Sequence, residues 1–174
     1  RLEKMVSGRY MGELFGMAIA ELLGEKGKKY GFTSIDMSNI ILDETAGLSE
    51  VGRIVSAKTG HDLEEVDRQR LQELAAALVV RSARLVTATY VGIIWQLAGD
   101  EAIKKQHIAI DGSVYEKMPL AKENIMRALS ELLGESASLV DTVLENGGSR
   151  RRHRRCHVAA AGIRQSAKPD YPTV

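Results

Sequence analysis

The chain has 174 residues, of which 44% are hydrophobic and 27% charged, with a formal net charge of +1. These values are typical of a single soluble globular domain and argue against nucleic-acid binding by the body of the chain. No uninterrupted apolar run reaches the roughly 20 residues that span a bilayer, so no membrane contact is expected. The single cysteine, Cys156, excludes an intrachain disulfide and favours a cytoplasmic protein.

The first predicted element is an amphipathic helix. Hydrophobic side chains recur at helical spacing in residues 2–23, so most of this segment should form one helix with an apolar stripe. Gly24 and Gly27 follow and predict its end. In residues 30–60, polar residues and glycines alternate with short apolar runs, which predicts loops and short helices with residues 40–42 as the buried part.

A long helical stretch is predicted in the middle of the chain. Asp62 followed by Glu65 resembles a capping box, which would open helical structure up to about Leu97. We expect two consecutive or kinked helices, because the first half is charged and the second half is apolar on most sides. The apolar half should lie in the interior of the domain, and Gly99 should end it.

A β-hairpin is predicted next. Residues 107–110 are β-prone and precede Asp111 and Gly112, which form a turn signal. Residues 113–117 are therefore predicted to return as the second strand of the hairpin.

The remaining elements complete the prediction of fold class. Pro119 should begin a helix that runs to about Leu133 and is closed by Gly134. Residues 139–144 are long enough for a further buried strand. This order of elements predicts an α/β layered domain with more helix than sheet.

Several side chains could carry chemistry. Glu3 could accept hydrogen bonds from two neighbouring hydroxyls, which suits a sugar, but an acidic residue in a first helical turn also simply complements the helix dipole. Arg9 could neutralise phosphate oxygens or be a solvated surface charge. The hydroxyls of Thr45 and Ser49, four residues apart, could reach phosphate oxygens from one helical turn, although many surface helices have such pairs.

The Asp111-Gly112-Ser113 turn is the second candidate for a binding site. A sharp turn through glycine and serine leaves backbone N–H groups and a hydroxyl free to meet an anion or a ribose. A plain hairpin is the competing interpretation.

Four segments, taken in order, resemble the hexokinase family. Residues 3–8, Glu-Lys-Met-Val-Ser-Gly, resemble the family's Glu-Lys-Met-Ile/Val-Ser-Gly segment. Residues 45–49 (Thr-Ala-Gly-Leu-Ser) and 79–83 (Val-Val-Arg-Ser-Ala) resemble two later segments, which support the resemblance by their position. Residues 109–115, Ala-Ile-Asp-Gly-Ser-Val-Tyr, resemble the family's Asp-Gly-Ser/Thr-Val/Leu-Tyr turn. The resemblance covers nearly all of residues 1–149.

The resemblance implies a role for each matching residue. Glu3 matches the glutamate that hydrogen-bonds hexose hydroxyls, and Arg9 matches a position near the ATP phosphates that is often lysine. The other implied residues of the nucleotide site are Thr45, Ser49, Gly112, Ser113, Gly148 and Ser149. The last two match the start of a glycine-rich element beside the adenosine.

The resemblance also implies a fold and a reaction. Residues 1–149 should be the C-terminal portion of the large lobe of an actin-like ATPase, which is a ribonuclease H-like fold. The implied reaction is ATP-dependent phosphorylation of a hexose such as glucose, with Mg²⁺ bound through ATP and no metal ligands in this chain. The catalytic aspartate and the missing N-terminal lobe of the same enzyme would lie upstream, so these residues alone should be inactive.

The tail, residues 150–174, departs from the family pattern with an arginine-rich run at residues 150–157. One interpretation is a basic patch for nucleic acid or membrane. Another is a metal site at His153, Cys156 and His157, which lacks a second ligand group.

A third interpretation of the tail is a shifted reading frame. If Arg150 to Arg152 are encoded CGG-CGN-CGG, the frame one base later reads Gly, a variable residue and Gly. That would restore the expected glycine-rich element, and residues 150–174 would then be non-native and disordered. The codons of the gene decide this hypothesis.

Two alternative functions stay open at this point. One is a sugar kinase or ATPase of the same superfamily with another substrate. The other is a non-enzymatic helical module that binds nucleic acid through the arginine tail.

Overall fold

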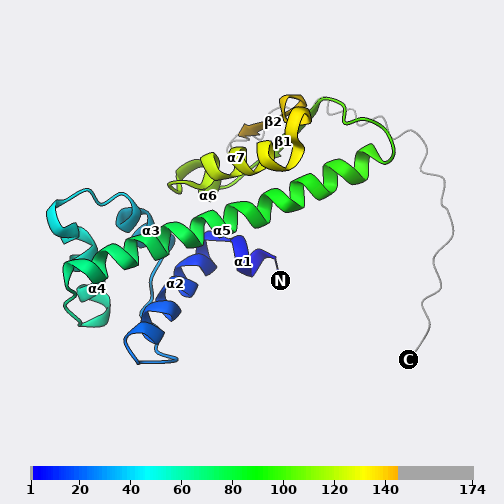
Figure 1. The fold of residues 1–174 in the computed structure, drawn as a ribbon. Helices are drawn as coiled ribbons and strands as arrows, with labels where there is room; N and C mark the ends of the chain where they lie inside the picture. The colour runs from blue at the N-terminus through cyan, green and yellow to red at the C-terminus, as the bar shows by residue number, and fades with distance from the viewer. Residues whose placement is uncertain (1, 145–174) are drawn as a thin grey trace, which may run out of the picture.

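The computed structural model of the chain describes residues 2–144 (Figure 1). Helices dominate the described part, and a two-stranded parallel sheet lies at its C-terminal end. In chain order the elements are α1 (Glu3–Val6), α2 (Gly8–Leu22), α3 (Ser34–Ile41), η1 (Ala46–Leu48), α4 (Ser49–Thr59), α5 (Glu65–Ala98), β1 (Gln106–Ile110), α6 (Ser113–Lys117), α7 (Ala121–Leu133), η2 (Gly134–Leu139) and β2 (Val140–Leu144). The α/β expectation with more helix than sheet is confirmed.

The predicted first helix is broken once. Ser7 has an extended backbone, with φ −74° and ψ 140°, so the short α1 ends there and α2 begins at Gly8. From that point α2 is regular, and it buries Met11, Phe15 and Ile19. The predicted end at the glycines is confirmed, because the helix stops at Leu22.

The capping box predicted at Asp62 is wrong. Asp62 Oδ1 instead accepts a hydrogen bond from the Ser56 hydroxyl at 3.0 Å, and α5 begins after Glu64 without a side-chain cap. A complete capping box lies earlier, at the start of α3. There Thr33 Oγ1 accepts from the Asp36 N–H, and Asp36 Oδ2 accepts from the Thr33 N–H at 2.7 Å.

The short helices predicted in residues 30–60 are present as α3, η1 and α4. Burial in residues 40–42 is limited to the first of them. Ile40 is fully buried, whereas Leu42 is 64% exposed because α3 has ended before it.

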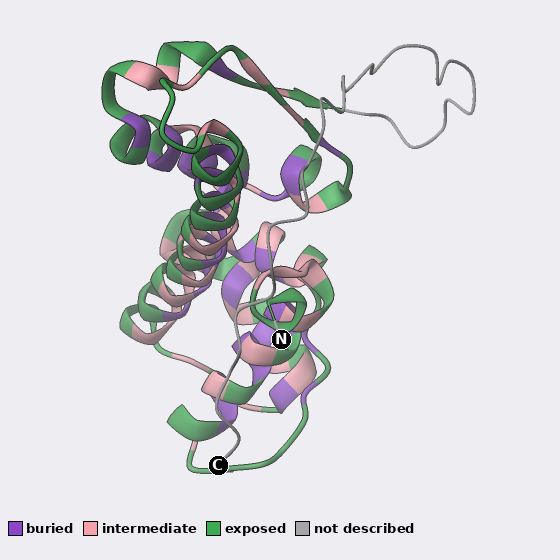
Figure 2. Cartoon of the chain, turned by 90° about the vertical axis from the view of Figure 1, so that its right-hand side faces the viewer, coloured by how far each residue is buried: buried purple, intermediate pink, exposed green. Residues whose placement is uncertain are grey.

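The long helix α5 is a single element of 34 residues, so the expected break or kink is absent within it. The expectation that its second half is buried all round is also wrong. Ile93, Trp95 and Leu97 are each more than half exposed, while the residues on the inner stripe are covered. Gly99 ends the helix as predicted. Exposed residues are prominent at this end of the helix in Figure 2.

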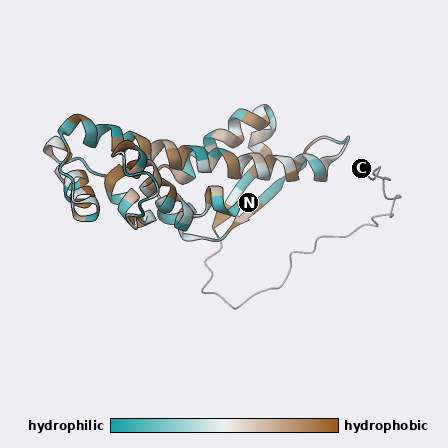
Figure 3. Ribbon diagram, turned by 90° about the horizontal axis from the view of Figure 1, so that it is seen from below, coloured by the Kyte–Doolittle hydropathy of each residue, from teal (hydrophilic) through white to brown (hydrophobic). Residues whose placement is uncertain are grey.

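By length and composition alone, α5 is long and apolar enough to cross a membrane, a test that core helices of soluble proteins also pass. About a third of its most apolar 18-residue window is buried inside the described structure. Leu71, Ala75, Val79 and Val91 are buried along α5 and pack against neighbouring elements. Figure 3 shows that hydrophobic residues, in brown, alternate with hydrophilic ones, in teal, along the helices.

The predicted hairpin is wrong, although both predicted strands at 107–110 and 139–144 are confirmed. Residues 113–117 form the helix α6, and β1 pairs in parallel with β2, so that Gln106 faces Val140 and Ile110 faces Leu144. Parallel strands need a long crossover connection. Helices α6, α7 and η2 supply it, and α7 begins at Ala121 and ends at Leu133, close to the prediction.

Two hydrophobic clusters hold the fold together. The first joins α2, α3, α4 and the N-terminal half of α5, together with Met118 just before α7 and Ala121 at its start. The second joins the C-terminal half of α5 to β1, α6, the rest of α7 and β2. The helix α5 is therefore shared by both clusters, and the two meet near its middle.

Candidate functional site

A cleft of about 430 Å³ lies where the two clusters meet. One wall is formed by residues 7–9 at the start of α2, and the opposite wall by residues 111–113 between β1 and α6. The middle of α5 supplies its floor through residues that include Val79 and Ser82. The opening segment and the Asp-Gly-Ser turn, about 100 positions apart in the sequence, therefore line one cleft.

The two walls approach each other closely at Gly8. A Cβ atom placed on Gly8 would lie 2.9 Å from Val114 Cγ2 and 3.5 Å from Ser34 Cβ, so only glycine fits there without a shift of its neighbours. One turn later, a Cβ on Gly12 would lie 2.6 Å from the Phe32 carbonyl oxygen. The glycines of the opening segment thus allow α2 to pack closely against the second wall and the residues before α3.

The start of α2 favours an anion in the cleft. The first N–H groups of an α-helix have no partner within the helix, and the helix dipole places partial positive charge there. Within the described residues, Ser7 makes no side-chain cap hydrogen bond to this turn. Arg9 adds a full positive charge; its side chain is 81% exposed and lies 3.8 Å from Glu13.

The second wall is held by a buried tyrosine. Tyr115 on α6 is 6% exposed, and its hydroxyl lies 2.7 Å from the Thr142 hydroxyl on β2. Thr142 Oγ1 also lies 3.3 Å from the Met126 sulfur on α7. Tyr90 of α5 lines the cleft nearby, and burial, together with the proximity of Tyr115, raises the pKa of Tyr90.

Glu3 is not among the residues that line this cleft. It lies on the exposed single turn α1, one turn before the wall at residues 7–9. Its backbone is tied to that wall, because the Ser7 N–H donates to the Glu3 carbonyl at 2.9 Å. The predicted hexose ligand and the predicted phosphate neighbour Arg9 therefore lie on consecutive helical turns of one continuous segment.

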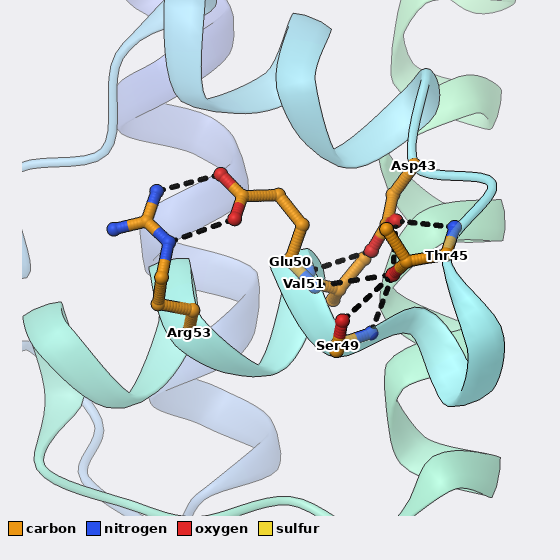
Figure 4. Close-up of polar contacts among 6 residues, drawn as sticks. All are labelled: Asp43, Thr45, Ser49, Glu50, Val51 and Arg53. Carbon is orange, nitrogen blue, oxygen red and sulfur yellow. Dashed lines mark hydrogen bonds and ion pairs between the residues drawn. The ribbon is translucent and has the colours of Figure 1, made fainter.

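Thr45 and Ser49 come together with each other but do not line the cleft (Figure 4). Thr45 Oγ1 accepts hydrogen bonds at 2.9 Å from both the N–H and the hydroxyl of Ser49, and donates to Asp43 Oδ1 at 2.6 Å. Asp43 Oδ2 accepts from the Val51 N–H at 2.8 Å. These groups together cap the start of α4.

Asp43 is buried, at 7% exposure, and is the only one of the three side chains in this network (Asp43, Thr45 and Ser49) that is. Burial opposes its ionisation, but hydrogen bonds from the hydroxyl and N–H of Thr45 and from the N–H groups of Val51 and Glu50 hold the pKa of Asp43 below its ordinary value. Nearby, Arg53 donates two hydrogen bonds to the Glu50 carboxylate, at 2.6 and 2.7 Å, on the exposed side of α4 (Figure 4).

Arg68 and Gln72 of α5 brace the same loop. Arg68 donates to the Gly47 carbonyl at 3.0 Å, and Gln72 Nε2 donates to the carbonyls of Ile40 and Asp43 at 3.0 and 2.9 Å. The loop that carries Thr45 is therefore fixed from the central helix.

The remaining predicted site residues, Gly148 and Ser149, lie outside the described residues, as does the whole tail at 150–174. Within residues 2–144, no group of three or more histidine, cysteine, aspartate or glutamate side chains is placed to hold a metal ion.

Sequence reasoning missed two serines of the cleft, Ser34 and Ser82. Ser34 carries no motif of its own. Ser82 lies inside the segment 79–83, which resembles a hexokinase segment but which predicted no role for this serine.

Comparisons with known proteins place the chain in a family. The sequence model of the family described as Hexokinase matches residues 1–151. The chain belongs to the hexokinase family. Among the relatives, Hexokinase-7 of Oryza sativa subsp. japonica is 33% identical over 168 residues, covering 84% of this chain and 35% of that protein. Hexokinase-2 of Candida albicans is 30% identical over 154 residues, covering 82% of this chain and 31% of that protein.

A crystal structure of a hexokinase matches the fold with a TM-score of 0.64 at 24% sequence identity, covering 82% of this chain and 33% of that one. The fold is thus that of part of a hexokinase, an actin-like ATPase fold. The chain spans about a third of the length of these curated relatives.

Proposed function

We propose that this chain is the C-terminal part of a hexokinase that transfers the terminal phosphoryl group of ATP to a hexose hydroxyl. The cleft between residues 7–9 and 111–113 would take the nucleotide, and Glu3 would hold the sugar. The main support for this proposal is that the opening segment and the Asp-Gly-Ser turn line the same cleft.

The residues of the cleft fit a nucleotide phosphate. Gly112 has a φ of 146° and a Cβ on it would meet no atom within 4 Å, so its backbone is open to a close approach. The start of α2 offers unpaired N–H groups and Arg9 a positive charge, both suited to phosphate oxygens. The hydroxyl of Ser113, on the opposite wall, could donate to phosphate or ribose.

In phosphoryl transfer, positioning of the reactants and stabilisation of charge dominate catalysis, so different parts of the enzyme can supply different roles. This segment would position the hexose through Glu3 and the nucleotide through the cleft. The catalytic aspartate, as base for the hexose hydroxyl, and the upstream phosphate loops would come from the rest of the enzyme. Mg²⁺ would arrive bound to ATP and neutralise phosphate charge. Residues 1–174 alone should therefore have no measurable hexose kinase activity.

The test measures phosphorylation of glucose, fructose and mannose by the full-length protein that carries this segment. We expect ATP-dependent phosphorylation of at least one hexose, and a loss of at least about 100-fold in kcat/KM for Glu3→Gln, since a carboxylate acceptor is replaced by an amide. The matched control is Glu21→Gln, an exposed glutamate near the end of α2 that does not line the cleft. Full activity of Glu3→Gln, or turnover of none of these sugars, would overturn the proposal.

A further inference from the structure

We propose that Ser82 is a positioning residue, which fixes the junction of α1 and α2 and thereby sets Glu3 relative to the nucleotide wall. The inference rests on the proposed function and adds a role for the hydroxyl of Ser82, which so far is only part of the cleft floor. Ser82 is 4% exposed, and its hydroxyl donates to the Val6 carbonyl at 3.1 Å, across 76 positions of sequence.

The acceptor of this hydrogen bond is unusual for a hydroxyl within a helix. Serine and threonine side chains in helices commonly donate to the carbonyl four residues earlier. Thr87 and Thr89 on α5 do so, to Ala83 and Leu85. Ser82, on the same helix, instead reaches a different element.

The acceptor lies at the point where the chain bends. Val6 is the last residue of α1, and the extended Ser7 interrupts the helix directly after it. Carbonyls at a helix end lack partners within the helix, and Ser82 supplies a donor to one of them. A helix of four residues is not stable by itself, so its placement depends on such contacts with the body of the fold.

The consequence reaches both ligand sites. Glu3 lies on that single turn, and its carbonyl accepts from the Ser7 N–H. Gly8, packed against Val114, starts the nucleotide wall on the other side of the bend. Ser82 therefore fixes the α1–α2 junction, which lies between the proposed sugar ligand Glu3 and the proposed phosphate site. Ser82 itself binds neither the sugar nor the phosphate.

The experiment compares Ser82→Ala, Ser82→Thr and Thr87→Val in the full-length protein. Thr87→Val is the matched control, because it removes a fully buried hydroxyl from α5 that contacts α7 rather than α1. The measurements are kcat and KM for glucose and MgATP, the melting temperature, and hydrogen exchange of residues 3–9.

We expect Ser82→Ala to raise KM for glucose about tenfold and to speed exchange at residues 3–9, because the Val6 carbonyl loses its hydrogen-bond donor from α5. Ser82→Thr, which keeps the donor, should stay within about twofold of the parent. Thr87→Val should lower the melting temperature and leave both readouts unchanged.

The role of Ser82 is overturned if Ser82→Ala lowers the melting temperature like the control but changes neither KM nor exchange at residues 3–9. If the full-length protein phosphorylates no hexose, the proposed function fails instead. The exchange comparison then still decides whether Ser82 fixes the α1–α2 junction.

Discussion

Gly8 lies beside Val114, although 106 positions separate them, and leaves no room there for a side chain between the two walls of the cleft. A side chain on Gly8 would come within 2.9 Å of Val114 Cγ2, closer than carbon atoms approach without displacement. The glycine of the opening segment is thus explained by packing against the valine of the later one.

Gly8→Ala should therefore destabilise the fold by about 1–3 kcal/mol, the usual cost of overpacking. Gly92→Ala on α5 is the matched control, because a Cβ there would meet no atom within 4 Å. That substitution should stabilise by about 0.5–1 kcal/mol through helix propensity. Urea unfolding measures both, and Val114→Ala should recover part of the loss in the Gly8→Ala variant. Equal effects of the two glycine substitutions would contradict the packing at Gly8.

Arg9→Ala should weaken nucleotide binding without loss of stability. The Arg9 side chain is 81% exposed and its ion pair with Glu13 is long, so the free energy of unfolding should change by less than about 0.5 kcal/mol. KM for MgATP should rise about three- to tenfold at low salt, and less at high salt, where counterions screen the charge. The same measurements on Arg70→Ala, an exposed arginine outside the cleft, should show no change in KM.

Asp43→Asn should remove a pH-dependent part of the stability. Because the pKa of Asp43 is lowered in the folded state, its ionised form stabilises the fold above the ordinary carboxyl pKa of 3.8. This contribution is lost as the pH falls through the lower folded pKa. The parent should exceed Asp43→Asn by about 1–3 kcal/mol at pH 7, and the difference should shrink in strongly acidic solution.

Urea unfolding at several pH values measures this difference. Glu44→Gln, a neutralised neighbour with an exposed side chain, is the control and should follow the parent. A difference between parent and Asp43→Asn that does not depend on pH would show that the Asp43 hydrogen bonds do not need the charge.

Tyr115→Phe should loosen the second wall. The substitution removes the hydroxyl that meets Thr142, at a cost of about 0.5–1.5 kcal/mol. A double-mutant cycle with Thr142→Val separates this contact from other effects of each substitution. A coupling energy near zero in thermal unfolding would mean that the two hydroxyls do not stabilise each other.

Much of the fold could be predicted from local patterns. The apolar spacing of α2 and α7, the terminating glycines and the β-prone runs all predicted elements that the structure has. The errors arose where distant contacts decide. Residues 113–117 are as compatible with a strand as with a helix, and the parallel pairing of β1 with β2 turns them into the start of a crossover.

The candidate site divides in the same way. The opening segment and the Asp-Gly-Ser turn could be selected from the sequence as candidate binding elements because their residue types suit phosphate and sugar. Their proximity was not, since no local pattern reports that Gly8 packs against Val114. Ser82 escaped notice because an isolated serine within a helix carries no signal until its acceptor is known.

The uninterrupted course of α5 has a mechanical consequence. A helix of 34 residues is about 50 Å long, and this one is embedded in both hydrophobic clusters, with the cleft at its midpoint. A rotation of one hydrophobic cluster relative to the other would require α5 to bend. The two cleft walls should therefore move together as a rigid body. If a hexose and a nucleotide are enclosed during turnover, the domain that moves to enclose them must then belong to another part of the enzyme.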